Sequence, residues 1–185
     1  MAMYDLPTSV EIDGEDWAIN SDYRAVLDIC TALADVELNE QERAIVTLQI
    51  FYPDFDDMNP KDYNEAIAKC MEFINLGKAP KPEEQNSPKM IDWEQDFQLM
   101  VAPINTVAGK EIRALDYLHW WTFISYYNEI NGDSTFAQVV QLRSKMAKGK
   151  KLEKSDLEFY RANRDLVDFK NKYTPEDNAV IDEWI

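Results

Sequence analysis

Four acidic side chains have a spacing that could bind a metal ion. They occupy the first, third, ninth and twelfth places of a calcium-binding loop: Asp54, Asp56, Asp62 and Glu65. Met58 stands at the fifth place, and Asn59-Pro60 replaces the glycine that such a loop needs at the sixth. We therefore expect an acidic turn before a helix rather than a calcium site.

The remaining groups that could do chemistry are a histidine and two sets of carboxylates. His119 is the only histidine, and Asp116 is its one neighbour at ligand spacing, so we expect a hydrogen-bonded or half-exposed side chain. The carboxylates at 92, 94 and 96 and at 153, 156 and 158 lie at predicted helix starts, where they complement the helix dipole. No nucleophile elbow, phosphate loop, dinucleotide fingerprint or zinc spacing occurs in the sequence. We expect no enzyme activity, no cofactor and no metal.

The elements that must position these residues are centred on residues 115–130, LDYLHWWTFISYYNEI. At about 100° per residue, five large side chains fall on one side of a helix: Tyr117, Trp120, Trp121, Ile124 and Tyr127. Further apolar residues interrupt the opposite side, and a helix that is apolar nearly all round is normally buried. We predict a mainly α-helical, compact multi-helix domain around a buried aromatic helix at about residues 115–130.

Residues 9–19 predict a short N-terminal β-hairpin before the helices. Polar and apolar residues alternate at 9–12 and 16–19 across Asp13-Gly14, a dipeptide that suits a type I′ turn. Asn39 with Glu42 predicts a capping box at the start of one helix. Asn59-Pro60 predicts the start of another, which Gly77 ends.

Helical signals continue to the C-terminus. Pro103 is expected to kink or end a helix over residues 92–102. Ser155 is expected to cap a helix that runs to about Lys172, and Thr174-Pro175 to start a short last helix.

The length of 185 residues suits one domain, residues 1–185. Three prolines and mixed charges at 78–91 indicate a linker, which is a candidate subdomain boundary. The two cysteines, Cys30 and Cys70, each lie in an apolar helical pattern, so we expect buried thiols of a cytosolic chain. The sequence contains no run of 18 uncharged apolar residues, and we expect no membrane-spanning segment.

The net charge of −16 is unevenly distributed. Residues 1–60 carry fourteen acidic residues against two arginines, whereas residues 137–173 carry ten basic against five acidic residues. This separation is suited to head-to-tail association of copies or to a basic partner, and it argues against non-specific nucleic-acid binding. Six basic residues crowd the second region: Arg143, Lys145, Lys148, Lys150, Lys151 and Lys154. A solvated helix end and a nucleic-acid site are alternative interpretations, and we predict that these residues take part in self-association.

Several segments resemble a small protein family from the tail-gene modules of Gram-positive siphophages and their prophages. They are LHWWTF at 118–123, Thr135-Phe136, RSKMAKGKKLEK at 143–154, FYRANR at 159–164, and LPTSVEIDG at 6–14 with Tyr23-Arg24 downstream. The similarity covers nearly the whole chain and is most specific at 115–173, whereas residues 104–109 depart from the family's more regular aromatic-rich helix. Members are described as hypothetical phage proteins or tail assembly chaperones, encoded just before the tape measure protein.

The resemblance implies a non-enzymatic chaperone that keeps the tape measure protein soluble and templates the tail tube. It implies a homo-oligomer in the host bacterial cytoplasm that binds the tape measure protein and other tail assembly proteins and does not remain in the mature virion. A tape measure protein is a long helical protein whose apolar stripes need cover, and a groove lined by aromatic side chains suits that task. The candidate partner-binding residues are Trp17, Trp93, Trp120, Trp121, Tyr127 and Trp184.

Two other functions compete with this hypothesis. The first is an acidic inhibitor or decoy, whose N-terminal sixty residues would occupy a nucleic-acid-binding surface of a host protein. Binding by a decoy should weaken in salt, whereas an apolar chaperone surface should tolerate salt. The second is a structural virion component, which would be found in purified particles.

Overall fold

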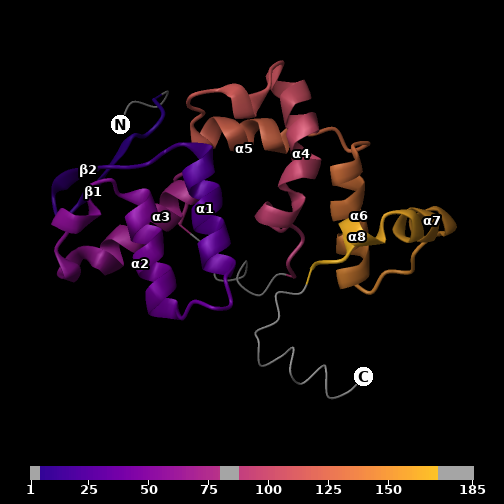
Figure 1. Ribbon diagram of the computed structural model, residues 1–185, viewed down its shortest axis with the longest axis horizontal. Coiled ribbons are helices and arrows are strands. Elements are labelled where there is room, and N and C mark those ends of the chain that lie inside the picture. Colours follow the sequence, from indigo (N-terminus) through magenta and orange to yellow (C-terminus); the bar gives the residue numbers. More distant parts are fainter. Residues whose placement is uncertain (1–4, 80–87, 171–185) are drawn as a thin grey trace. The chain divides into compact units, whose positions relative to one another are not determined.

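The computed structural model describes residues 5–79 and 88–170, and over these residues the chain is mainly α-helical (Figure 1). A two-stranded antiparallel hairpin and a cluster of buried aromatic side chains accompany the helices, so the predicted fold class is confirmed. The described residues form two compact units, one of 5–79 with His119–Trp121 and one of 88–118 with 122–170. Most of the predicted linker at 78–91 lies outside the described residues, as do the predicted last helix and Trp184.

The hairpin of the first unit pairs β1 (Ser9–Ile12) with β2 (Glu15–Ala18). Its register places Ile12 opposite Glu15 and leaves a two-residue turn. Both turn residues have positive φ, 49° at Asp13 and 80° at Gly14, as a type I′ turn requires. The turn predicted from the Asp-Gly dipeptide is therefore confirmed.

Three helices complete the first unit: α1 (Tyr23–Ala34), α2 (Glu40–Phe51) and α3 (Tyr63–Ile74). The Asp22 carboxylate caps α1, and Asn39 and Glu42 form the predicted capping box of α2. Short 3-10 turns at Phe55–Asp57 and Pro60–Asp62 precede α3. The large core side chains come from the hairpin, all three helices and the start of α5: Ile12, Tyr23, Ile29, Leu48, Phe51, Tyr52, Phe73 and Trp120.

The aromatic helix α5 spans Trp120–Asn128 and is shorter than the predicted range of 115–130. His119 forms an antiparallel bridge with Asp22, and the Trp120 N–H donates to the Ser21 carbonyl at 2.8 Å. This extended pairing fixes the backbone just before Trp120, so the helix cannot begin earlier. A short 3-10 turn at Ile112–Ala114 precedes it.

In the second unit, α4 spans Trp93–Ala108 and contains Pro103. Of the two expected effects of Pro103, a kink or an end of the helix, the end is wrong, because α4 continues to Ala108. Ile104, the next residue, is fully buried, and its packing holds the last turn although Pro103 cannot donate a backbone hydrogen bond. Gly109, at φ 67°, ends the helix instead.

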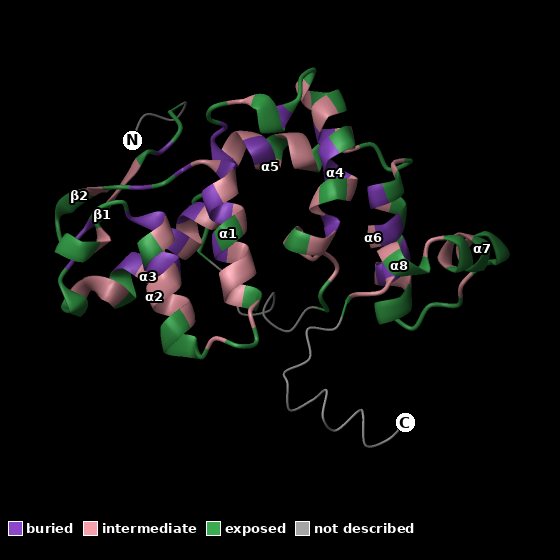
Figure 2. Cartoon of the chain, viewed as in Figure 1, coloured by how far each residue is buried: buried purple, intermediate pink, exposed green. Residues whose placement is uncertain are grey.

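The second unit also contains α6 (Thr135–Ala147), α7 (Lys154–Ala162) and α8 (Arg164–Val167). The single helix predicted from Ser155 to about Lys172 is therefore interrupted, with a break at Asn163, and Glu153 rather than Ser155 is its N-cap. Figure 2 shows buried positions alternating with exposed ones along α6. None of the described helices is long and apolar enough to span a membrane.

Candidate functional site

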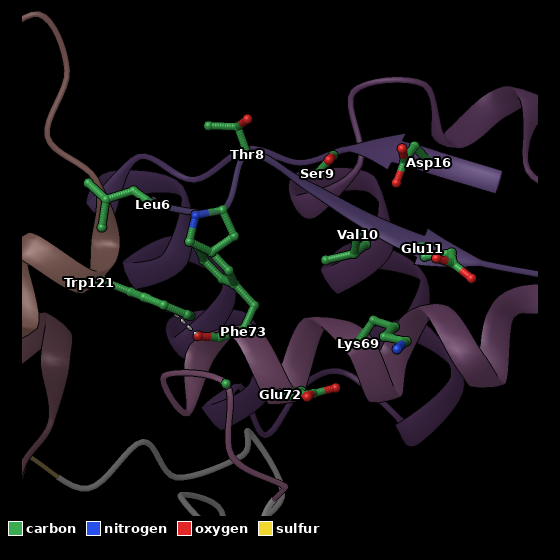
Figure 3. Close-up of a pocket in the computed structure, with 12 residues that line it drawn as sticks. Leu6, Thr8, Ser9, Val10, Glu11, Asp16, Lys69, Glu72, Phe73 and Trp121 are labelled. Atoms are coloured by element: carbon green, nitrogen blue, oxygen red, sulfur yellow. Dashed lines mark hydrogen bonds between the residues drawn. The ribbon is translucent and has the colours of Figure 1, made fainter. Parts of the chain in front are cut away.

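A groove of about 550 Å³ lies in the first unit between β1 and α3 (Figure 3). One wall is a continuous backbone stretch, residues 6–11, and the other is α3. Figure 3 shows Phe73 and Trp121 together at one end. The full lining is Leu6, Pro7, Thr8, Ser9, Val10, Glu11, Asp16, Lys69, Glu72, Phe73, Gly77 and Trp121.

Trp121 is held firmly at this end of the groove. Its indole N–H donates to the Phe73 carbonyl at 2.9 Å, and the two rings stack with centroids 5.9 Å apart. Gly77 has φ 78°, and a Cβ built there would lie 3.5 Å from the indole. The candidate Trp121 thus presents a fixed, half-buried aromatic surface to the groove.

His119 holds the segment that positions Trp121. Its Nε2 donates to the Pro7 carbonyl at 2.9 Å, and its Nδ1 accepts the Trp121 backbone N–H at 3.0 Å, so the imidazole is the neutral Nε2–H tautomer. The side chain is 2% exposed, and burial lowers its pKa against a smaller opposing effect of the Pro7 carbonyl. The expected hydrogen-bonded histidine therefore ties the segment just before β1 to the start of α5.

The groove carries an excess of negative charge. Glu11 and Asp16 come from the hairpin and Glu72 from α3, whereas Lys69 is the only basic residue among the described residues that line the groove. Leu6 at the rim is 47% exposed and adds apolar surface. A ligand that fits this groove combines apolar groups with positive charge.

Two other candidate tryptophans of the first unit lie elsewhere. Trp120 is 2% exposed, and its indole N–H donates to the Ile74 carbonyl at 3.0 Å, so it belongs to the core. Trp17 is half-buried and packs edge-on against Tyr52 at 6.5 Å. Of these side chains, only that of Trp121 lines the groove.

Trp93 and Tyr127 form an aromatic cluster in the second unit. Their ring centroids lie 5.4 Å apart, and Tyr127 also meets Phe136 edge-on at 5.8 Å. Both candidates are half-buried. Burial raises the pKa of Tyr127, with a further contribution from Asp96. The cluster packs the second unit, and Trp184 lies outside the described residues.

The six predicted basic residues have different environments. Arg143 is 5% exposed and forms a bidentate ion pair with the fully buried Asp96, at 2.6 and 3.0 Å. The prediction that Arg143 takes part in self-association is therefore corrected. The apolar residues beside it in α6 carry Arg143 into the interior. Lys145 binds Asp156 at 2.7 Å. The exposed basic side chains are those of Lys148, Lys150, Lys151 and Lys154.

The carboxylates considered for chemistry have structural roles in the second unit. Asp92 caps α4, Asp96 binds Arg143, and Glu153 and Asp156 form the capping box of α7. The bond from Lys145 holds the pKa of Asp156 below its usual value, aided by the Glu153 backbone N–H. Among the described residues, no group of three or more metal-binding side chains is placed to hold an ion.

Sequence reasoning missed most of the groove. Alternation at 9–12 indicated a strand, but it carried no signal that α3 lies beside the outer edge of β1. Lys69, Glu72 and Phe73 lie on two adjacent turns of α3, a spacing that also suits an ordinary half-buried helix. Only the tertiary packing brings them together with residues 6–11.

Comparison with known proteins gives a family match over most of the chain. Residues 3–169 match the sequence profile of the family described as Bacteriophage Gp15 protein. No curated protein and no solved structure matches the chain.

Proposed function

Because the chain belongs to the Bacteriophage Gp15 protein family, we propose that it is a non-enzymatic tail assembly chaperone that binds the tape measure protein. In this proposal it works in the host bacterial cytoplasm, self-associates, contacts other tail assembly proteins and needs no cofactor. It leaves before the virion is complete. Neither nucleic acid nor a membrane is a partner.

The groove of the first unit is the observation that carries the proposal. A tape measure protein exposes apolar side chains until tube subunits enclose it, so its chaperone needs an apolar surface that is open before binding. Leu6 and the half-buried Trp121 supply such a surface in a phage family protein, with the buried Phe73 packed behind Trp121. The fixed indole of Trp121 limits the conformational entropy lost on binding.

The charge distribution supports self-association. The exposed lysines at 148, 150, 151 and 154 are opposite in sign to the acidic N-terminal sixty residues. Attraction between these regions of different copies favours head-to-tail assembly, and salt weakens it.

A complementation experiment in the phage that encodes the chain tests the proposal. Deleting the gene should give heads without tails and an insoluble tape measure protein, and the wild-type gene should restore tails. Leu6→Asp at the groove rim should fail to restore them. Val36→Asp is the matched control, because Val36 is 45% exposed and lies outside the groove.

Two outcomes would contradict the proposal. Normal tails after deletion would remove the assembly role. Stoichiometric amounts of the chain in purified wild-type particles would identify a structural component instead.

A further inference from the structure

We propose that the outer edge of β1 is a binding site for an extended peptide, which adds to the hairpin as a third strand. The peptide alternates apolar and basic residues. This inference rests on the proposed function only in taking the groove as the binding surface, and it names the mode of binding and the chemistry of the segment bound.

The register of the hairpin shows which backbone groups face the groove. Ile12 and Glu15 flank the two-residue turn, and the Ile19 N–H donates to the Thr8 carbonyl at 3.0 Å. In an antiparallel pair, alternate residues exchange hydrogen bonds with the partner strand. Thr8, Val10 and Ile12 therefore face β2, and the N–H and C=O groups of Ser9 and Glu11 point outward.

In the described part of the chain, His119 satisfies the first outward group of this edge, and no group pairs with the next ones. The Pro7 carbonyl accepts the bond from His119, which closes one end. Within residues 5–79 and 88–170, the outward backbone groups of Ser9 and Glu11 make no hydrogen bond. Proteins usually cover or block a free strand edge, because it is a template for another strand.

The groove gives this edge the form of a peptide site rather than an open surface. Figure 3 shows Ser9, Val10 and Glu11 along one side and Lys69 and Glu72 of α3 along the other. A volume of about 550 Å³ lies within the range of ligand pockets in general. In strand addition, main-chain hydrogen bonds supply affinity and flanking pockets select alternate side chains.

The two faces of the hairpin set the pattern of the peptide. Glu11 and Asp16 are directly opposite in the register and share one face, so a third strand places basic side chains there. Val10 lies on the other face, and the groove end formed by Phe73 and Trp121 receives apolar side chains. Because side chains alternate along a strand, basic and apolar residues alternate in the bound segment.

Fluorescence anisotropy with the full chain and a labelled hexapeptide of alternating lysine and valine tests the proposal. Ser9→Pro removes the outward N–H and no hairpin bond, and it should weaken binding tenfold or more. Ala18→Pro is the matched control, because Ala18 is paired with Ser9 and its N–H points away from β1. It should change the affinity less than twofold, and circular dichroism should show both variants folded.

Peptide controls separate strand addition from charge attraction. N-methylation of every second peptide residue should abolish binding when the methylated amides face β1 and should leave binding intact when the other set is methylated. A hexapeptide of alternating glutamate and valine should bind at least tenfold more weakly. Equal affinities for wild type and Ser9→Pro would overturn the proposal, as would no peptide binding at all. A dimer of the free chain that Ser9→Pro dissociates would assign the edge to a second copy and also overturn it. None of these results decides whether the chain keeps the tape measure protein soluble, which the complementation experiment tests, so the two proposals fail separately.

Discussion

Replacing Asp96 by alanine is expected to destabilise the second unit more than any surface change. All five N–H groups of Arg143 have acceptors: Nε donates to Val167 O, Nη1 to Met90 O and Asp96, and Nη2 to Leu166 O and Asp96. The Asp96 carboxylate is fully buried. Its removal leaves a guanidinium buried without a counter-charge, which costs about 3–5 kcal/mol. That is a large part of a typical total stability of about 5–15 kcal/mol.

A double variant, Asp96→Ala with Arg143→Met, separates the charge effect from the hydrogen bonds. It removes both charges, but it leaves the carbonyls of Met90, Leu166 and Val167 without their donor. Water can replace the donor at the part-buried carbonyls of Met90 and Leu166, whereas the Val167 carbonyl stays unsatisfied at a cost of about 1–3 kcal/mol. We therefore expect the double variant to recover only part of the loss.

Urea unfolding of the full chain, followed by far-UV circular dichroism, measures these differences, and hydrogen exchange assigns them to α4 and α6. Glu158→Ala on α7 is the control, because its ion pair with Lys154 is exposed and should be worth less than about 1 kcal/mol. An Asp96→Ala loss no larger than that of Glu158→Ala would refute the reasoning.

Three further substitutions test other parts of the structure. Gly77→Ala should lower the free energy of unfolding in urea by about 1–2 kcal/mol, because φ is 78°. Gly149→Ala, at φ 60° with nothing within 4 Å of its Cβ, measures the cost of backbone strain alone. No loss of stability in either variant would contradict this account. Burial lowers the pKa of His119 below its ordinary value of 6.5, so the unfolded chain takes up a proton before the folded chain does as the pH falls. The stability that comes from the neutral folded imidazole is therefore complete above pH 6.5 and is lost as the pH drops toward the folded pKa. His119→Gln should flatten the fall in melting temperature between about pH 7.5 and 5.5, and an unchanged profile would contradict a buried neutral imidazole. Reversing the charge of Lys150 and Lys151 to glutamate should reduce the mass measured by light scattering at low salt, and an unchanged mass would refute head-to-tail association.

Local signals in the sequence predicted the parts of the fold that local chemistry decides. The positive φ of Asp13-Gly14 and the capping box of Asn39 each depend on residues within three positions of one another. Such contacts form wherever the segment lies in the protein, so the sequence alone identifies them.

Features that depend on distant residues could not be predicted in this way. Arg143 stands among surface lysines in the sequence, and its partner Asp96 lies 47 positions away. The start of α5 is set by Ser21 and Asp22, about a hundred residues upstream. The groove likewise requires α3 beside β1, and no periodicity in either segment encodes that contact.

Co-expression of the chain with the tape measure protein of the same phage, followed by sizing with light scattering across a salt series, tests the chaperone proposal most directly. The account predicts that the tape measure protein is insoluble alone. It predicts a soluble complex with the chain that persists at high salt and that Leu6→Asp disrupts while Val36→Asp does not. No rescue and no complex would contradict the account, and a complex that dissociates in salt would favour the acidic decoy.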